Sequence, residues 1–234
     1  MIEAQANNRP CLWSALWRPW GLAYLAMLLA GLAAGLWPQA IYPPWRNHPG
    51  PLPALQCVIM AQAAFVLMVH PLLLRSMAGP CPGRYVLAAA IQSVFLLLLA
   101  APLYAAAAFL ADARAMDVLR AATYIVALWP LAWWGGWVLG RSSGGASAAL
   151  IVLMLVALGL PAAWYIASDL LNSPAAETLW RLSPLLESWS SAASRSGDLL
   201  PSPAWPLVAW PLVAAVLALA ALLSRKHGLP GRAR

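Results

Sequence analysis

Six apolar stretches, each long enough to cross a lipid bilayer, dominate this sequence, and none of them contains an Asp or a Glu. About twenty apolar residues make one helical crossing, and a helix satisfies its own backbone hydrogen bonds in lipid. The sequence therefore predicts an all-α integral membrane protein whose residues 1–234 form a single transmembrane domain. The six predicted crossings are 20–37, 52–74, 85–111, 118–140, 146–168 and 205–224.

The absence of acids from these stretches also bears on energetics. Ion-coupled carriers usually place a carboxylate at membrane depth, despite its cost there. All seven acidic residues lie instead in the N-terminal tail or in loops. The sequence therefore indicates that, if the protein moves a substrate, the energy comes from a partner chain.

Composition excludes several other classes of protein. The chain is 63% hydrophobic and 9% charged, whereas soluble domains carry about 25% charged residues. The net charge of +7 comes from cations spread singly along loops, so nucleic-acid binding is not expected. Cys11, Cys57 and Cys81 lack metal-ligand spacing, and His70 is a lone histidine near the inner end of the second crossing. No catalytic residue, metal or cofactor is predicted on this chain.

The distribution of charge predicts the orientation. Nine Arg and Lys residues fall in the segments on one side of the predicted crossings and five on the other, while six of the seven acids fall on the second side. Because positive loops stay in the cytoplasm, both termini are predicted to be cytoplasmic, including the tail 225–234. This topology suits a multi-pass protein of a bacterial-type inner membrane.

Two segments outside the crossings are predicted to be helical. Residues 10–20 carry Leu and Trp at helical spacing beside two Arg residues, which is typical of an interfacial helix; the alternative is an extended first crossing. The outer segment 169–204 is predicted to form short helices against the membrane, and the alternative is an exposed loop. Its buried side chains are expected to be Trp180, Leu185, Leu186 and Trp189, and its acids Asp169, Glu177, Glu187 and Asp198 are expected to face external solvent.

Within the crossings, proline and glycine mark special positions. Pro102, Pro130, Pro161 and Pro211 are each expected to kink a helix, because proline removes one backbone hydrogen bond. Small residues four positions apart permit close helix packing in lipid. Two such pairs are predicted as packing seams: Gly31 with Gly35, and Gly136 with Gly140.

The arrangement resembles the ABC transporter permeases of the exporter type, the type-two permease family. Six crossings, cytoplasmic termini, an interfacial N-terminal helix and a long outer segment before the last crossing are similar to that family over nearly the whole chain. Three short stretches are similar as well: the inner segment Arg75-Ser-Met-Ala-Gly-Pro-Cys-Pro-Gly-Arg84-Tyr85, the step Leu158-Gly-Leu-Pro161, and the outer step Leu182-Ser-Pro-Leu185.

This resemblance implies a function and partners. The chain would be the permease subunit of an exporter of lipid-like or amphipathic molecules, paired with a second permease copy or a related permease. Cytoplasmic ATPase subunits would bind ATP and Mg. The outer helices would form a lid over the translocation path. Contact with the ATPase is expected at Arg75, Ser76, Gly83, Arg84 and Tyr85.

Two other functions remain open from the sequence. A non-transporting membrane scaffold or anchor subunit suits the lack of charge in the crossings equally well. A substrate-capturing subunit of a vitamin importer also has six crossings, although the long outer segment fits it poorly. Co-purification of an ATPase would separate a transporter from a scaffold.

Overall fold

The computed structural model describes residues 19–41, 54–78, 82–141, 143–193 and 209–216. These residues form helices joined by short turns, and no strand occurs among them. Among the described residues, four helical segments are long and apolar enough to span a membrane. The predicted all-α membrane architecture is therefore confirmed at this level, whereas the full count of six crossings stays a prediction.

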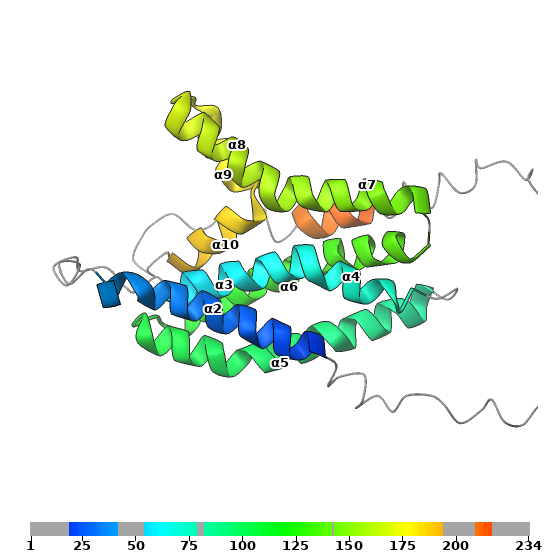
Figure 1. Cartoon of the computed structure of the whole chain (residues 1–234), viewed down its shortest axis with the longest axis horizontal. Helices are drawn as coiled ribbons and strands as arrows, with labels where there is room; N and C mark the ends of the chain where they lie inside the picture. The colour runs from blue at the N-terminus through cyan, green and yellow to red at the C-terminus, as the bar shows by residue number, and fades with distance from the viewer. Residues whose placement is uncertain (1–18, 42–53, 79–81, 142, 194–208, 217–234) are drawn as a thin grey trace, which may run out of the picture.

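The first three predicted crossings form one side of the bundle (Figure 1). The second crossing contains a π-helical segment, η3, between two α-helices. The elements are α2 (Pro19–Ile41), α3 (Ala54–Ala64), η3 (Phe65–Val69), α4 (His70–Arg75) and α5 (Pro82–Leu110). The strongly apolar part of α2, Trp20–Leu36, is shorter than the four helices that are long enough to span a membrane.

The remaining elements complete the bundle. The fifth crossing is a succession of α- and π-helical segments, and two shorter helices follow it. The elements are α6 (Ala115–Arg141), α7 (Ser143–Met154), η4 (Leu155–Gly159), α8 (Leu160–Tyr165), η5 (Ile166–Leu170), α9 (Ala175–Leu182) and α10 (Pro184–Ala193). Residues 209–216, from within the predicted sixth crossing, are helical.

Proline explains two of the π-helical segments. Pro71 and Pro161 follow η3 and η4 closely, and a proline ring both lacks an N–H and clashes with the carbonyl four residues earlier. A π-helical turn takes up that misfit. Figure 1 shows the fifth crossing bending near η4, so that α8 leans away from the bundle. At Pro102 and Pro130, in contrast, α5 and α6 continue as α-helices.

The helix ends gather at two opposite ends of the bundle. Arg75, Pro82, Arg141 and Ser143 lie at one end, which we name the inner end, and Ala54, Leu110 and Ala115 lie at the other, the outer end (Figure 1). The two ends match the alternating sides predicted from the loop charges. Which end faces the cytoplasm stays a prediction.

The core of the bundle is apolar with a few polar ties. The Tyr24 ring on α2 packs against Phe65 of η3, with ring centroids 4.6 Å apart, and the Tyr24 hydroxyl donates to the Leu96 carbonyl at 3.1 Å. α2 lies close to α3 at Gly31, where an added Cβ would be 2.9 Å from the Cys57 carbonyl oxygen. Gly35, the other member of that predicted pair, is buried.

Some predictions lie outside the described residues. These are residues 10–18 of the interfacial helix, the end of the outer segment at 194–204 including Asp198, most of the sixth crossing and the tail 225–234.

Candidate functional site

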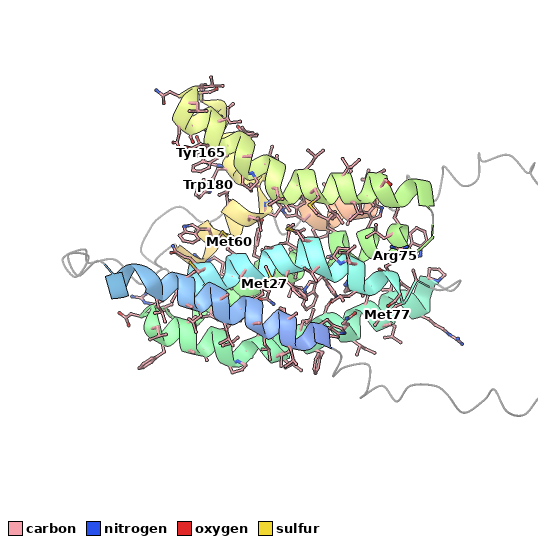
Figure 2. The ribbon with its side chains drawn as sticks, viewed as in Figure 1. Met27, Met60, Arg75, Met77, Tyr165 and Trp180 are labelled. Atoms are coloured by element: carbon pink, nitrogen blue, oxygen red, sulfur yellow. The ribbon has the colours of Figure 1, made fainter. Side chains whose placement is uncertain are left out.

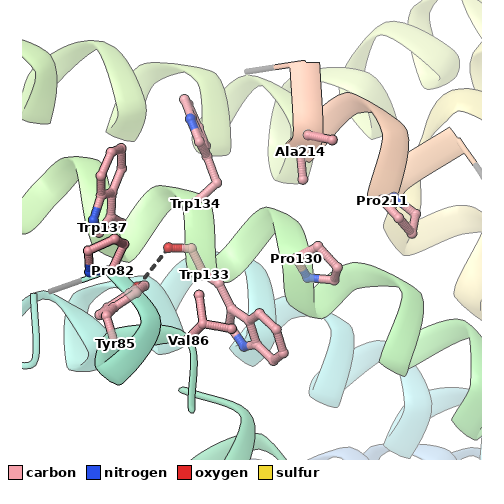
Figure 3. A pocket seen from close by; sticks show the side chains of 10 residues that line it. Pro82, Tyr85, Val86, Pro130, Trp133, Trp134, Trp137, Pro211 and Ala214 are labelled. Carbon is pink, nitrogen blue, oxygen red and sulfur yellow. Dashed lines mark hydrogen bonds between the residues drawn. The ribbon is translucent and has the colours of Figure 1, made fainter. Parts of the chain in front are cut away.

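A cavity of about 410 Å³ lies where the start of α5, the inner half of α6 and the helical residues 209–216 meet (Figure 3). Its lining is aromatic and aliphatic, with no charged side chain. The residues that dominate it are Tyr85, Pro130, Trp133, Trp134, Trp137 and Pro211.

Helical periodicity brings the α6 residues together. Positions three and four apart lie on neighbouring parts of one helix surface, and Pro130, Trp133, Trp134 and Trp137 follow this spacing. The three Trp side chains line a cavity, although Trp residues of membrane proteins often lie at headgroup level. Their clustering beside a proline on one helix is the sequence signal that indicates a cavity instead.

Two hydrogen bonds fix the wall of the cavity. The Tyr85 hydroxyl of α5 donates to the Trp133 carbonyl of α6 at 2.6 Å (Figure 3). The Trp133 indole Nε1 donates to the hydroxyl oxygen of Ser93, a buried residue of α5, at 3.0 Å. The buried Trp134 Nε1 has no hydrogen-bond partner within the described part of the chain.

A seam of small residues lies close to this cavity. A Cβ added at Gly136 would stand 2.6 Å from the Leu74 Cβ and 2.7 Å from the Tyr85 hydroxyl oxygen. A Cβ added at Gly140 would collide with the Ala78 Cβ and lie 2.7 Å from the Arg75 carbonyl oxygen. The second predicted glycine pair therefore lies in a close contact between α4 and α6, within this chain.

The residues predicted to contact an ATPase divide into two groups. Arg75, Ser76, Gly83 and Arg84 are exposed at the inner end, where Figure 2 labels Arg75. Tyr85 is buried and belongs to the cavity wall. Of the five predicted residues, the first four therefore lie on the exposed surface of the inner end, and their contact with an ATPase stays a prediction.

The predicted lid residues lie on two short helices at the outer side. The Trp180 ring of α9 meets the Trp164 ring of α8 edge-on, with centroids 4.9 Å apart (Figure 2). On α10, Leu185 is buried, while Leu186 and Trp189 are half-buried. α9 packs along α8, and α10 packs against α3 and α6.

Two of the acids predicted to face solvent are exposed. These are Asp169 and Glu177, and Glu177 pairs with Arg181 at 2.5 Å.

Glu187 does not face solvent, and that prediction was wrong. Only 4% of its surface is exposed, because α10 lies across α3 and α6 instead of on the surface. The Trp210 side chain lies beside the Tyr124 hydroxyl of α6, and the Glu187 carboxylate acts on that hydroxyl electrostatically. Periodicity along the crossings gave no sign that a loop helix would pack against them.

Asp117 supplies a second correction. α6 begins at Ala115, three residues before the predicted start, so Asp117 lies in its first turn and is buried. Its Oδ2 accepts a hydrogen bond from the Arg114 N–H at 3.0 Å. A carboxylate at the third helical position commonly closes a helix start in this way, so we assign Asp117 to capping.

Thr123 and His70 are further polar residues of the crossings. The Thr123 hydroxyl donates to the Leu119 carbonyl at 2.7 Å, one turn earlier on α6. His70 is buried, and neither ring nitrogen has a hydrogen-bond partner among the residues described. Within the same residues, no group of three His, Cys, Asp or Glu side chains is placed to hold a metal.

Compared with known protein families, with curated proteins and with solved structures, the chain matches none of them.

Proposed function

We propose that this chain is the membrane-spanning permease subunit of an ATP-driven transporter for lipid-like or amphipathic molecules. The observation that carries the proposal is the aromatic cavity between α5, α6 and residues 209–216. Its volume of about 410 Å³ falls in the range of small-molecule sites, which are mostly apolar clefts with a few polar groups. A substrate of this class would leave the lipid for the cavity without exchanging its apolar contacts for water.

The inner end supports a cytoplasmic partner. Arg75 at the end of α4 and Arg84 at the start of α5 are both exposed, with Ser76 and Gly83 beside them. This segment carries no acidic residue, in contrast to the coupling segment of exporter-type permeases. We therefore expect the ATPase surface that meets it to be acidic, because complementary charge guides association.

The cavity is close enough to this surface for movement to pass between them. Tyr85 follows Arg84 directly, and its hydroxyl is bonded to the Trp133 carbonyl. Displacement of the start of α5 by a partner would therefore move one wall of the cavity against the other. Switching proteins commonly use such shifts of packed helices.

A second function, that of a non-transporting scaffold, is favoured by a different observation. The outward sides of α5 and of the fifth crossing are apolar and little buried within the chain, as at Leu98, Phe109 and Leu155. Lipid covers such a surface in a permease, whereas neighbouring subunits would cover it in a scaffold.

Isolation of the complex from native membranes in mild detergent separates the two functions. A photo-crosslinker at Ser76 should give an adduct with a chain that contains a Walker A motif, and one at Thr178, exposed on α9 at the outer side, should not. A complex that contains other membrane subunits and no nucleotide-binding chain would refute the ATP-driven permease and favour the scaffold.

A further inference from the structure

The aromatic cavity is open on one side, toward the surface of the bundle. Of the residues that line it, Pro82, Val86 and Ala215 are exposed, whereas Tyr85 and Ala214 are buried. Val86 belongs to α5, which is long and apolar enough to span a membrane. The open side of the cavity therefore faces the bilayer.

The depth of the cavity matches one leaflet of a membrane. Pro130 and Trp137 are the first and last lining residues of α6, which is α-helical as far as Arg141. At 1.5 Å of rise per residue, Trp137 lies about 6 Å and Pro130 about 17 Å from the inner end of that helix. Half of the hydrocarbon core of a bilayer is about 15 Å. The cavity therefore extends from near the inner end to about the middle of the membrane.

The lining of the cavity suits a flexible chain better than a packed helix. Helices meet closely in lipid through small residues, as Gly136 and Gly140 of α6 do against Leu74 and Ala78 in this chain. The cavity is lined instead by three Trp, three Pro, a Tyr, a Val and two Ala residues. Bulky rings hold a partner backbone at a distance, but they offer apolar contact to a hydrocarbon chain along its length.

Two cations lie at the inner end of the cavity. The carbonyl oxygen of Arg75 would be 2.7 Å from a Cβ added at Gly140, which is three residues beyond Trp137 on α6. Arg84 directly precedes Tyr85, which lines the cavity. Both arginines are exposed, neither forms an ion pair within the described part of the chain, and the segment between them contains no acid. Basic sites between transmembrane helices commonly bind anionic lipid headgroups.

We propose that the cavity binds the acyl chain of an anionic membrane lipid whose headgroup lies at Arg75 and Arg84. The chain enters from the bilayer through the open side beside Val86 and Ala215 and lies along the rings of α6, while the phosphate stays at the inner end. Because the same two arginines are proposed to meet the ATPase, the bound headgroup lies next to the coupling contact. This assignment rests on the proposed function and names its substrate class.

Photolabelling of the full chain in phosphatidylcholine nanodiscs tests this site. The probe is a low mole fraction of phosphatidylglycerol with a diazirine in its acyl chain, and the comparison is phosphatidylcholine with the same modified chain. Mass spectrometry of the adducts should show stronger labelling of residues 130–137 and 211–215 by the anionic probe. Leu155 and Leu158, exposed apolar residues of the fifth crossing, are the reference for general contact with lipid, and both probes should label them equally.

Variants then locate the acyl chain and the headgroup. Ala215→Phe fills the cavity and should remove the labelling within it, whereas Val216→Phe, at the next exposed position, should retain that labelling. The double variant Arg75→Gln with Arg84→Gln should lower labelling of the cavity by the anionic probe about five- to thirtyfold and leave the comparison probe unchanged. Arg181→Gln removes an exposed cation on α9; it is the matched control and should change neither.

The outcomes separate this inference from the proposed function. If both probes label the cavity equally and the double arginine variant changes neither, the anionic headgroup site is refuted, while the cavity remains a site for the apolar part of a substrate. If neither probe labels residues 130–137, or if Ala215→Phe leaves that labelling unchanged, the cavity holds no lipid chain, and the proposed function fails with the inference.

Discussion

Replacement of Gly136 by Ala gives the sharpest test of how α4 and α6 pack. Two opposite effects meet at this position. Alanine favours a helix interior over glycine by about 1 kcal/mol, which alone would stabilise the protein. The added Cβ, however, would lie 2.6 Å from the Leu74 Cβ, 2.7 Å from the Tyr85 hydroxyl oxygen and 3.0 Å from the Pro71 carbonyl oxygen.

The steric effect should win. The Leu74 Cβ and the Pro71 carbonyl are fixed close to or within the backbone, so relief requires α4 and α6 to move apart. Overpacking of this kind costs about 1–3 kcal/mol. The added Cβ would also push the Tyr85 hydroxyl aside, which disturbs its bond to the Trp133 carbonyl. For a chain of this length, each kcal/mol of lost stability lowers the melting temperature by about 2–4 °C.

The assay is thermal unfolding of the purified protein in detergent, followed by intrinsic fluorescence. Gly136→Ala should lower the melting temperature by a few degrees. Gly83→Ala is the matched control, because no heavy atom lies within 4 Å of its added Cβ, and it should leave the melting temperature unchanged or slightly higher. A Gly136→Ala variant as stable as the unaltered protein would show that the helices do not meet this closely.

Three further predictions concern orientation, the outer helices and the cavity wall. In a cysteine-free background, Thr178→Cys should react with an impermeant reagent in intact cells and Ser76→Cys should not; the opposite pattern refutes the predicted topology. Trp180→Ala removes an edge-on ring contact worth about 0.5–1.5 kcal/mol, so backbone hydrogen exchange should become faster in α9 and stay the same in α6. Unchanged exchange in α9 would contradict the packing of α9 on α8. Tyr85→Phe deletes one hydrogen bond to the Trp133 carbonyl and should cost about 1 kcal/mol of stability; a neutral effect in thermal unfolding would mean that this bond does not hold the wall.

Much of the fold follows from hydrophobic length and proline chemistry. The crossing predicted at 85–111 is observed as Pro82–Leu110, and that at 52–74 as Ala54–Arg75. Both are runs of apolar residues with clear breaks at each end, so a count of residues against membrane thickness is sufficient. The bend near Pro161 likewise follows from a missing N–H within one segment.

The site depended on contacts that no single segment contains. Glu187 lies in a polar stretch with the composition of a surface helix, and only its docking against α3 and α6 buries it. Tyr85 stands within a stretch that resembles a coupling segment, yet its side chain points into the bundle and bonds to α6. Burial of this kind is decided by which helices become neighbours, and periodicity along one helix carries no information about that.

Transport by inside-out vesicles tests the central claim, that the aromatic cavity between α5, α6 and residues 209–216 is the substrate site. Ala215 and Val216 are neighbours in the chain and both are exposed, but only Ala215 lines the cavity. ATP-dependent accumulation of a fluorescent amphipathic lipid should be lost in Ala215→Phe, which fills the cavity, and retained in Val216→Phe at equal expression. Equal accumulation in the two variants, at the level of the unaltered protein, would contradict the account.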